Sequence, residues 1–501
     1  MPATLATIAA DLGAAGLLAG GPSQAGDPLL VDATHDSRAV EPGGLFCAIP
    51  GTVTDGHDHV EDAVARGAGA VLVDREVRVD VPSLRVTDVR AATGPAAAAI
   101  HGHPSHRLRV VGVTGTNGKT TVAHLLESAF GAAGLGTGLL GTVETRIHGE
   151  GEPGGRTTPE GTDLQRLLAR MWDRGVDAVS MEVSSHGLDL HRVDGTHFAV
   201  GVFTNLSQDH LDWHETMDRY FDAKAHLFDP GRCDRAVICV DDDWGRRLVA
   251  RIGPDVDTVG RSPDATVRIV DERSTRTGAT AQVRWGEDTL EVSTRLVGAY
   301  NVTNAVQAVV AAVRAGVDVA SAIHGVANTS PIRGRLERVD AGQPFDVLVD
   351  YAHTPEAIRS VVHAVRDTLE DGGRLVLVLG AGGDRDRDKR GPMGAAAAGA
   401  DVVVVTSDNP RSEDPLGIID AIVTGVRAAD PPVRFVVEPD REAAIATALA
   451  EAGAGDVVVI AGKGHETTQQ FADRTIDFDD HQVARRLLTS SNTPVGSEAA
   501  S

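Results

Sequence analysis

The sequence predicts an α/β protein in three domains. A central domain with a doubly wound, mostly parallel sheet is flanked by a smaller N-terminal α/β domain and a C-terminal Rossmann-like α/β domain. Short apolar runs alternate with helical patterns along most of the chain, which is typical of parallel strands covered by helices. Several of these runs lead directly into glycine-rich polar loops. The length of 501 residues fits about two to four domains.

The bulk composition excludes several classes of protein. The profile of 42% hydrophobic and 24% charged residues is that of a soluble globular protein, and no apolar run is long enough to span a membrane. The formal net charge of −24 argues against partners that are nucleic acids or anionic membranes. An anionic substrate would therefore need local basic residues to hold it.

The N-terminus and the cysteines indicate a cytoplasmic location. The opening "MPATLATIAADLGAAGLLAGG" has no Lys or Arg before its apolar part, so it does not read as a secretory signal and predicts a short helix. The three cysteines (Cys47, Cys233 and Cys239) form neither a CxxC pair nor a metal-binding spacing. We interpret them as reduced thiols.

The N-terminal domain is expected at 1–107. Its strands are predicted in three apolar runs, at 44–50, 69–74 and 84–89, separated by turn-rich joins. The stretch "HGHPSHRL" at 101–108 predicts the linker to the next domain.

The central domain is expected at 108–331. A buried strand is predicted at 109–115, followed by a glycine-rich loop and a helix at 120–134 that ends at a glycine. A long helix is predicted at 298–316. Further strands are predicted at 178–184, 199–206, 235–242, 266–272 and 281–286.

The C-terminal domain is expected at 332–488, and residues 489–501 are predicted to be a disordered tail. Four apolar strands in this domain run into polar loops, "FDVLVDYAHTP", "GRLVLVLGAGGDRDRDKRGPM", "DVVVVTSDNPRSEDP" and "DVVVIAGKGHE". Because open α/β sheets bind ligands at the carboxyl ends of their strands, these loops are candidate binding loops.

The stretch "VTGTNGKTT" at 113–121 is the strongest candidate site. The strict phosphate-loop pattern has a glycine where Val113 stands, so the spacing is unusual, but a strand still enters the loop and a helix leaves it. Backbone N–H groups in such a loop can bind phosphate oxygens. Lys119 is expected to reach the outer phosphates of ATP and Thr120 to bind Mg²⁺. The alternative is a glycine-rich turn with an incidental lysine.

Lysine is rare in this chain. Only four of the 47 basic residues are lysines, at positions 119, 224, 389 and 463, and the others are arginines. Lysines that persist under such a bias are candidates for places that need a compact ammonium or a nucleophilic amine. Chance retention is the alternative.

Two further stretches offer metal ligands. Glu182 follows an apolar strand in "SMEVSSHGLDLHRVDG", where a carboxylate can reach Mg²⁺, and Arg192 could hold an anionic group. The stretch "TNLSQDHLDWHE" contains two Asp and two His, among them His210, and its acidic character favours magnesium over zinc. A polar strand end and a solvated helix start are the alternatives. Lys224 lies on a helical pattern, either exposed or modified beside the metals.

The stretches "TSDNPRSEDP" and "AGKGHE" each follow an apolar strand. Asn409, Arg411 and Glu466 supply an amide, a guanidinium and a carboxylate. Together these groups could recognise the carboxylate and ammonium ends of an amino acid. Each stretch alone could be a turn.

In this order, these blocks resemble the Mur ligase superfamily, the ATP-dependent amide-forming ligases of peptidoglycan precursor synthesis. "TGTNGKTT" is the form that the phosphate loop takes there, and the resemblance covers about residues 30 to 485. Four stretches, "THDSRAVEPGGLFCAIPG", "TTP", "MEVSSHGL" and "DNPR", resemble the members that add meso-diaminopimelate to UDP-N-acetylmuramoyl-L-Ala-D-Glu. "DNPR" accompanies diaminopimelate in this family, so Arg411 is expected to bind the distal carboxylate.

The resemblance implies roles for individual residues. Those implied in catalysis are Lys119, Glu182, His210 and Lys224, the last carbamylated, and those implied for Mg²⁺ are Thr120, Glu182 and His210. The ATP site would comprise Gly115, Thr116, Asn117, Gly118, Lys119, Thr120, Thr121, Asn301, Arg335 and Asp350. The nucleotide-sugar substrate would contact Ser37, Thr157, Thr158, Ser184 and Arg192. Diaminopimelate would contact Arg385, Asp408, Asn409, Pro410, Arg411, Gly462 and Glu466.

The implied reaction is phosphoryl transfer from ATP to a carboxylate, followed by attack of an amine on the acyl phosphate. We expect a cytoplasmic monomer. The nearest alternative is the same ligase with L-lysine as acceptor, which Arg411 opposes because a cation repels the ammonium of lysine. Folylpolyglutamate synthase is a second alternative, opposed by the N-terminal "HDSR" and by "DNPR". A nucleotide-switched binding protein or P-loop motor and a non-catalytic regulator are more distant ones.

Overall fold

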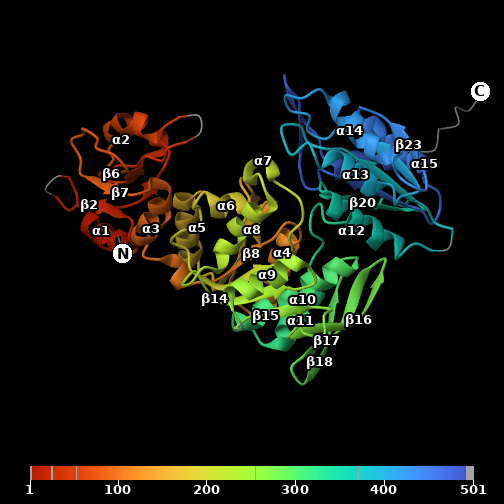
Figure 1. The fold of residues 1–501 in the computed structure, drawn as a ribbon, viewed down its shortest axis with the longest axis horizontal. Coiled ribbons are helices and arrows are strands. Elements are labelled where there is room, and N and C mark those ends of the chain that lie inside the picture. Colours follow the sequence, from red (N-terminus) through yellow and green to blue (C-terminus); the bar gives the residue numbers. More distant parts are fainter. Residues whose placement is uncertain (1–2, 24–25, 52–53, 254, 371, 492–501) are drawn as a thin grey trace, which may run out of the picture.

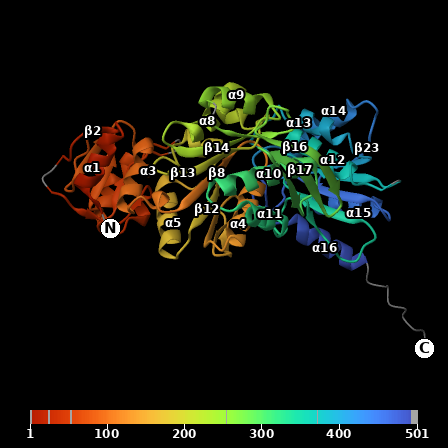
Figure 2. The same ribbon diagram turned by 90° about the horizontal axis from the view of Figure 1, so that it is seen from below.

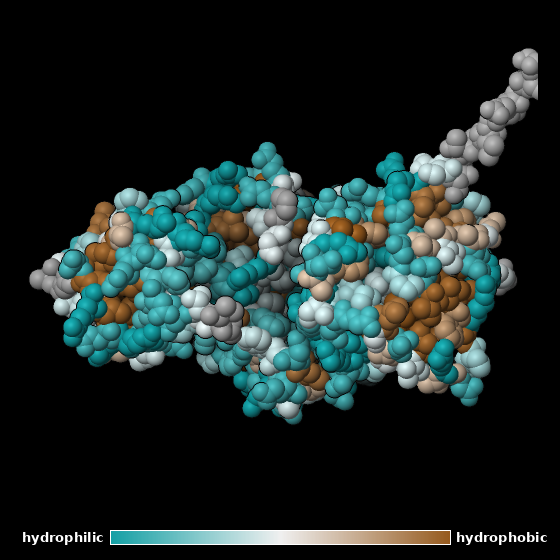
Figure 3. Space-filling view, turned by 90° about the horizontal axis from the view of Figure 1, so that it is seen from above, coloured by the Kyte–Doolittle hydropathy of each residue, from teal (hydrophilic) through white to brown (hydrophobic). Residues whose placement is uncertain are grey.

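The computed structural model describes residues 3–23, 26–51, 54–253, 255–370 and 372–491. Three α/β units lie side by side along the long axis, with the central unit between the other two (Figure 1). Within this described part, no helix combines the length and the apolar character that crossing a membrane requires. On the face in Figure 3, hydrophobic residues gather in separate patches among hydrophilic ones.

The central unit is built on an 11-stranded sheet with the order β11-β10-β9-β12-β8-β13-β14-β15-β16-β17-β18. The pairs from β9 to β16 are parallel, and an antiparallel hairpin extends each edge. Its strands are β8 (Arg109–Thr114), β9 (Thr137–Leu140), β10 (Glu144–Ile147), β11 (Glu150–Pro153), β12 (Ala178–Glu182), β13 (Phe198–Phe203), β14 (Cys233–Cys239), β15 (Asp257–Gly260), β16 (Val267–Thr275), β17 (Gly278–Trp285) and β18 (Asp288–Thr294).

Helices cover both faces of the central sheet, so the sheet is doubly wound. One apolar core joins it to α4 (Lys119–Ala132), α10 (Ala299–Arg314) and α11 (Val319–Ala327). A second core joins its other face to α5 (Gly161–Asp173), α8 (Met217–Ala225) and α9 (Asp243–Ile252). Figure 2 shows α8 and α9 across the strands from α4 and α11. The short helices α6 (Ser185–Asp189) and α7 (Leu211–His214) follow β12 and β13.

The C-terminal unit has a six-stranded sheet, parallel except at the β19 edge, with the order β19-β20-β24-β21-β22-β23. Its strands are β19 (Glu337–Arg338), β20 (Asp346–Asp350), β21 (Leu375–Leu379), β22 (Val402–Val405), β23 (Arg434–Val437) and β24 (Val457–Ala461), followed by the hairpin β25 (Thr468–Gln470) and β26 (Thr475–Asp477). One face packs on α12 (Pro355–Arg366), α13 (Arg390–Ala397) and α14 (Pro415–Arg427), the other on α15 (Arg441–Glu451) and α16 (Asp480–Ser491).

The N-terminal unit has a smaller five-stranded sheet with the order β2-β7-β6-β5-β4, antiparallel only at β2. Its strands are β2 (Leu18–Gly20), β4 (Ala33–Thr34), β5 (Leu45–Cys47), β6 (Ala70–Val73) and β7 (Ser83–Val86), and β1 (Ala3–Thr4) pairs with β3 (Leu29–Leu30). Helices α1 (Leu5–Ala14) and α3 (Val89–Ile100) pack on one face, and α2 (Val60–Ala65) packs on the other.

The predicted fold class and the predicted strands and helices are confirmed at the level of existence and type. The three main sheets fall within the three predicted segments, whereas the domain boundaries themselves stay predictions. The hairpin of β10 and β11 was not predicted, because its sequence is polar and lacks strand alternation. The predicted tail starts too early, since α16 continues to Ser491. The rest of that tail, 492–501, lies outside the described residues.

A buried ion pair ties together the edge of the C-terminal sheet that carries the binding loops. The guanidinium of Arg441 meets the carboxylate of Asp480 through two bonds, of 2.8 and 2.7 Å, and neither side chain is exposed. The same guanidinium donates to the carbonyl oxygens of Ser407 and Ala461, which follow or end strands β22 and β24. The pair therefore joins α15, α16 and the carboxyl ends of the two strands on either side of β21.

We expect Asp480→Asn to destabilise the C-terminal unit by about 3–5 kcal/mol, because it leaves the charge of Arg441 buried without compensation. Urea denaturation of the full chain would measure this, with the variant's transition shifted to lower urea. The matched control is Glu451→Gln, which breaks the more exposed pair of Arg434 and Glu451 and should cost less than about 1 kcal/mol. Equal effects of the two variants would contradict the expectation.

Candidate active site

The loop between β8 and α4 has the backbone geometry of a phosphate loop. Gly115 and Gly118 have φ angles of +144° and +90°, a region that favours glycine. A Cβ on Gly118 would lie 2.6 Å from Oδ1 of Asn304 on α10, so there is also no room for a side chain. The loop is fixed from the β13 side, since the N–H groups of Thr116 and Asn117 donate to Asn205.

Lys119 opens α4 and folds back over the loop. Its Nζ donates to the carbonyl oxygens of Gly115 (3.0 Å) and Thr116 (2.8 Å), which leaves one ammonium hydrogen for a ligand. Burial lowers the pKa of Lys119. The amine therefore lies where the outer phosphates of a nucleotide held by the loop would be expected.

Thr120 and Glu182 form a buried oxygen-donor pair beside the loop. The Thr120 hydroxyl donates to Oε1 of Glu182 (3.0 Å), which also accepts from the backbone of Thr142 (2.8 Å). The register of β12 against β8 pairs Glu182 with Val113, so the carboxylate lies level with the start of the loop. Hydroxyl and carboxylate oxygens suit Mg²⁺, which usually completes its shell with phosphate oxygens and water.

His210 and Lys224 line the same site. Burial lowers the pKa of His210 to about 3, so its ring is neutral and has a lone pair for a metal. Lys224, on α8, is fully buried: its Nζ donates to the carbonyl oxygen of Gly115 (2.7 Å) and lies 4.6 Å from the ring of Tyr220. Burial, reinforced by the charge of Lys119, holds the pKa of Lys224 well below its usual value. Within the described ranges, no group of three or more His, Cys, Asp or Glu side chains forms a metal site of its own.

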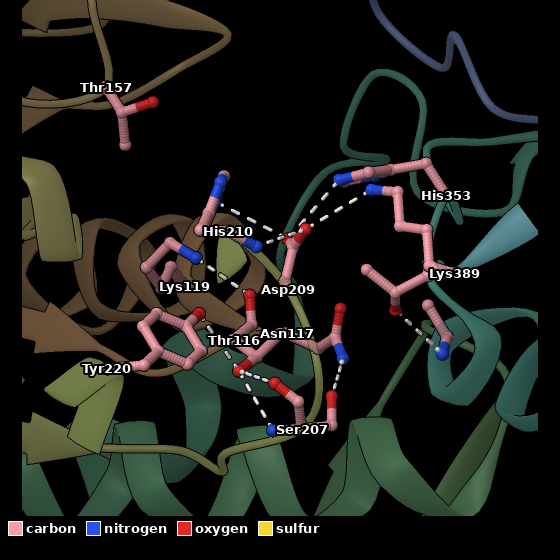
Figure 4. A network of polar contacts seen from close by, with 12 residues as sticks. Thr116, Asn117, Lys119, Thr157, Ser207, Asp209, His210, Tyr220, His353 and Lys389 are labelled. Atoms are coloured by element: carbon pink, nitrogen blue, oxygen red, sulfur yellow. Dashed lines mark hydrogen bonds and ion pairs between the residues drawn. The ribbon is translucent and has the colours of Figure 1, made fainter. Parts of the chain in front are cut away.

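Asp209 joins the central unit to the C-terminal unit (Figure 4). Its carboxylate is 3.2 Å from Nζ of Lys389, 3.4 Å from Nε2 of His210 and 3.7 Å from Nε2 of His353. Burial alone would raise the pKa of Asp209, but the nearby imidazole of His353 and the ammonium of Lys389 hold it well below its usual range. Arg335 makes a second link, donating to the Thr120 hydroxyl at 2.8 Å.

A cavity of about 670 Å³ runs along the loop between the central and C-terminal units. It brings together most of the predicted nucleotide, metal and catalytic residues and two of the predicted substrate residues: Thr116, Asn117, Gly118, Lys119, Thr120, Thr121, Thr157, Glu182, Ser184, His210, Lys224, Asn301, Arg335 and Asp350. Gly115 belongs to the loop but does not line the cavity, because it faces Thr204. The predicted diaminopimelate residues do not line this cavity.

The remaining residues predicted for the nucleotide sugar are spread over two units. The hydroxyls of Thr158 and Ser184 are 3.1 Å apart, and Ser184 also caps α6. Arg192 pairs with Glu160 at 2.8 Å, and its buried Nε has no hydrogen-bond partner in the described structure. Ser37 lies half-buried in the N-terminal unit.

The predicted amino-acid-binding residues gather at the carboxyl ends of β21, β22 and β24. Nδ2 of Asn409 donates to Oε2 of Glu466 at 2.7 Å. Arg411 donates from Nη1 to the carbonyl oxygen of Gly383 at 2.6 Å and has a positive φ of 53°. Asp408 precedes Asn409, Pro410 follows it, and Gly462 directly follows β24, while Arg385 donates to the carbonyl oxygen of Asp384.

Several cavity residues escaped prediction. Five of them lie in the loops that follow strands β13 and β20, and their position at carboxyl strand ends could have identified them. They are Thr204, Asn205, Ser207, Tyr351 and His353. Asn304 lies one turn after Asn301 on α10, the spacing of neighbours on one helix face. Asp241, Asp242 and Arg261 also line the cavity, and they follow strands β14 and β15, so they carried the same signal of a carboxyl strand end.

Fold and site together define a class of protein. A phosphate loop on a doubly wound sheet opens into a cavity that a second, Rossmann-like unit closes. Such a site binds a nucleoside triphosphate on one unit and can bring a second substrate to it from another. The chain is therefore a nucleotide-dependent enzyme assembled from separate α/β units.

Comparisons with known proteins identify the family. Three family models match: "Mur ligase family, catalytic domain" at 33–111, "Mur ligase middle domain" at 113–312 and "Mur ligase, glutamate ligase domain" at 334–464. The UDP-N-acetylmuramoyl-L-alanyl-D-glutamate--2,6-diaminopimelate ligase of Streptomyces coelicolor is 48% identical over 91% of this chain and 92% of its own. The protein of the same name from Geobacillus thermodenitrificans is 45% identical over 92% of this chain and 96% of its own.

Solved structures agree. A structure with the same ligase name is 32% identical, covers 93% of this chain and 96% of its own, and has a TM-score of 0.67. The MurF ligase of Thermotoga maritima in complex with ADP, at 19% identity over 92% of this chain and 97% of its own and a TM-score of 0.65, shares the fold. The chain belongs to the Mur ligase family. It is an ATP-dependent amide-forming ligase that releases ADP.

Proposed function

We propose that this ligase joins meso-diaminopimelate to the D-glutamate of UDP-N-acetylmuramoyl-L-Ala-D-Glu, a step of peptidoglycan precursor synthesis. The observation that carries the proposal is the similarity at 45–48% identity, over most of both chains, to ligases whose names state these two substrates. The position of Asn409, Arg411 and Glu466 on one edge of the C-terminal sheet supports it, because a doubly charged amino acid needs both cationic and anionic partners.

In the first half-reaction, the γ-carboxylate of D-glutamate attacks the γ-phosphate of ATP and forms an acyl phosphate. Lys119 offsets the negative charge that develops on the transferring phosphate oxygens. The backbone N–H groups from Gly118 to Thr120, at the start of α4, hold the remaining phosphates. We propose that Thr157 and Ser184, which line the cavity, orient the muramoyl peptide together with the adjacent Thr158 and Arg192.

We propose that Thr120, Glu182 and His210 hold Mg²⁺. Mg²⁺, when bound, supplies positive charge to the phosphate oxygens of ATP. The chemistry of these side chains fits, because two offer oxygens and the third is a neutral imidazole.

In the second half-reaction, the amine of diaminopimelate attacks the carbonyl carbon of the acyl phosphate, the new C–N bond forms, and phosphate leaves. Arg411 would bind the distal carboxylate, and Asn409 and Glu466 would bind polar ends of the amino acid. The central and C-terminal units that meet around Asp209 would keep water from the acyl phosphate.

We propose that Lys224 is carbamylated. Its lowered pKa supports this, because only the neutral amine adds to carbon dioxide, with release of a proton. Lys224→Met should lower kcat by about 10²-fold or more, since the carboxylate-like group that the carbamate would offer to Mg²⁺ beside the phosphate loop is lost. Arg219→Met, on the exposed side of the same helix, is the control. Wild-type activity that is insensitive to removal and return of bicarbonate, with an unmodified mass, would contradict carbamylation.

We infer that the protein works as a cytoplasmic monomer. The three cysteines are free thiols, as in a reducing compartment. The net charge of −24 opposes partners such as nucleic acids. Size-exclusion chromatography with light scattering would test the monomer, and a larger species would contradict it.

The experiment that tests the function is phosphate release from ATP and Mg²⁺ with UDP-N-acetylmuramoyl-L-Ala-D-Glu. meso-Diaminopimelate, L-lysine and L-glutamate are added separately. We expect release that depends on diaminopimelate. Release with L-lysine instead would keep the ligase and overturn the acceptor. Glutamate transfer to a folate would indicate the folylpolyglutamate synthase alternative.

A further inference from the structure

Lys463 lies beneath the amino-acid-binding residues without being open to solvent. It follows β24 in the loop "AGKGHE", and its side chain is 0% exposed, whereas the side chain of Glu466 is 30% exposed. Its Nζ donates to Oδ1 of Asn409 (3.2 Å), to Oε2 of Glu466 (3.0 Å) and to the carbonyl oxygen of Thr468 (2.6 Å). An ammonium has three hydrogens, so none is left for a ligand.

The ammonium fixes the orientation of Asn409. Because Lys463 can only donate, the amide group that faces it must be the oxygen, which also accepts from the N–H of Gln470 (3.0 Å). The amide nitrogen then points to Glu466 and donates to its Oε2 at 2.7 Å. One hydrogen of this nitrogen remains for a ligand carboxylate.

The same ammonium fixes Glu466. Oε2 of this carboxylate is occupied by the donors of Asn409 and Lys463, whereas Oε1 has no hydrogen-bond partner among the described residues. The three side chains thus form one hydrogen-bonded unit. It leaves one N–H and one carboxylate oxygen free, which are the groups that an amino acid's carboxylate and ammonium ends require.

This arrangement explains why the position is a lysine in a chain that otherwise uses arginine. Only four of the 47 basic residues are lysines. Three acceptor oxygens, those of Asn409, Glu466 and Thr468, surround the position of Nζ, which suits a compact ammonium. A guanidinium is larger, and its five donors would leave at least two without partners in a closed site.

We propose that Lys463 is a positioning residue for the acceptor amino acid: it holds Asn409 and Glu466 in the orientation that binds the acceptor, without contacting the acceptor itself. The inference rests on the proposed function, because it takes the acceptor to be meso-diaminopimelate. It predicts an effect on the KM for the acceptor rather than on the phosphoryl-transfer half of the reaction.

The test is a kinetic comparison of full-length Lys463→Met with the wild type, at saturating ATP and nucleotide-sugar substrate. We expect the KM for meso-diaminopimelate to rise about 10- to 100-fold, the range for losing hydrogen bonds to charged groups. The KM for ATP should change less than about twofold. A purely structural role would lower the fraction of active enzyme without changing this KM. Lys463→Gln, which keeps a donor without the charge, serves the same test where the methionine variant does not fold.

Two further variants sharpen the test. Arg474→Met removes an exposed cation between β25 and β26 and should leave every KM unchanged. In a double-mutant cycle, the KM effects of Asn409→Ala and Lys463→Met should be less than multiplicative, because part of the effect of Lys463 passes through Asn409 and the rest through Glu466. Effects that multiply would overturn the inference.

The outcomes separate the inference from the function. Wild-type enzyme that needs diaminopimelate for phosphate release, with an unchanged acceptor KM in both Lys463 variants, overturns the role of Lys463 and leaves the function standing. Wild-type enzyme that does not respond to diaminopimelate overturns the proposed function, and the inference with it.

Discussion

Lys119→Met is expected to lower kcat by about 10³-fold or more, as measured by phosphate release at saturating substrates. The physical reason is that charge is redistributed over the transferring phosphoryl group and the attacking and leaving oxygens as the transition state forms, and the ammonium of Lys119 stabilises this distribution. Two of its three hydrogens already bind the carbonyl oxygens of Gly115 and Thr116, so the ammonium is held at a fixed point over the loop. Lys119→Arg should not restore the rate, since a planar guanidinium cannot occupy that point.

The matched control is Arg109→Met. Arg109 is an exposed cation at the start of β8, the strand that leads into the phosphate loop. The substitution should leave kcat within about twofold, in line with ordinary surface substitutions. A Lys119→Met variant that keeps kcat and only raises the KM for ATP would show that the lysine binds the ground state alone, and the catalytic role would have to be abandoned.

The phosphate loop was predictable from the sequence because its information is local. A buried strand, two glycines at positions with positive φ, a lysine and a helix start follow one another within about a dozen residues, and Gly115, Gly118 and Lys119 take the geometry that this order requires. The carboxyl ends of the C-terminal strands were predictable for the same reason. Parallel strands bring their ends to one edge, and the residues that follow β22 and β24 meet there as expected.

The contacts between units were not predictable in this way. Asp209 and Lys389 are 180 residues apart, and no periodicity or turn signal relates them. Their contact depends on how the C-terminal unit packs on the central one. The buried pair of Arg441 and Asp480 was not predicted for another reason: sequence patterns assign charged residues to the surface. Only the topology that brings α15 and α16 onto one face of the sheet buries both.

Arg411→Ala is expected to reduce kcat/KM for meso-diaminopimelate by about 10²-fold or more, the effect of truncating one partner of a close charge pair. The value for L-lysine should fall much less, because lysine has no distal carboxylate. In the structure, the Arg411 guanidinium donates one bond, to Gly383, and its other donors have no partner among the described residues. Its left-handed backbone is held by the bond from its own N–H to Gln470, so the side chain leaves the loop in a set direction.

Reversing the charge at Arg411 tests the same role of this residue in acceptor selection. Arg411→Glu places an anion where the distal group of the acceptor is expected, so it should repel diaminopimelate and favour the ammonium of L-lysine. The preference between the two acceptors, measured as the ratio of their kcat/KM values, should therefore fall in Arg411→Ala and fall further in Arg411→Glu. Arg387→Ala, an exposed arginine of the neighbouring loop, should leave the ratio unchanged. If diaminopimelate and lysine lose activity equally in both Arg411 variants, the arginine supports the loop rather than selecting the acceptor, and selection must reside elsewhere at the carboxyl edge of this sheet.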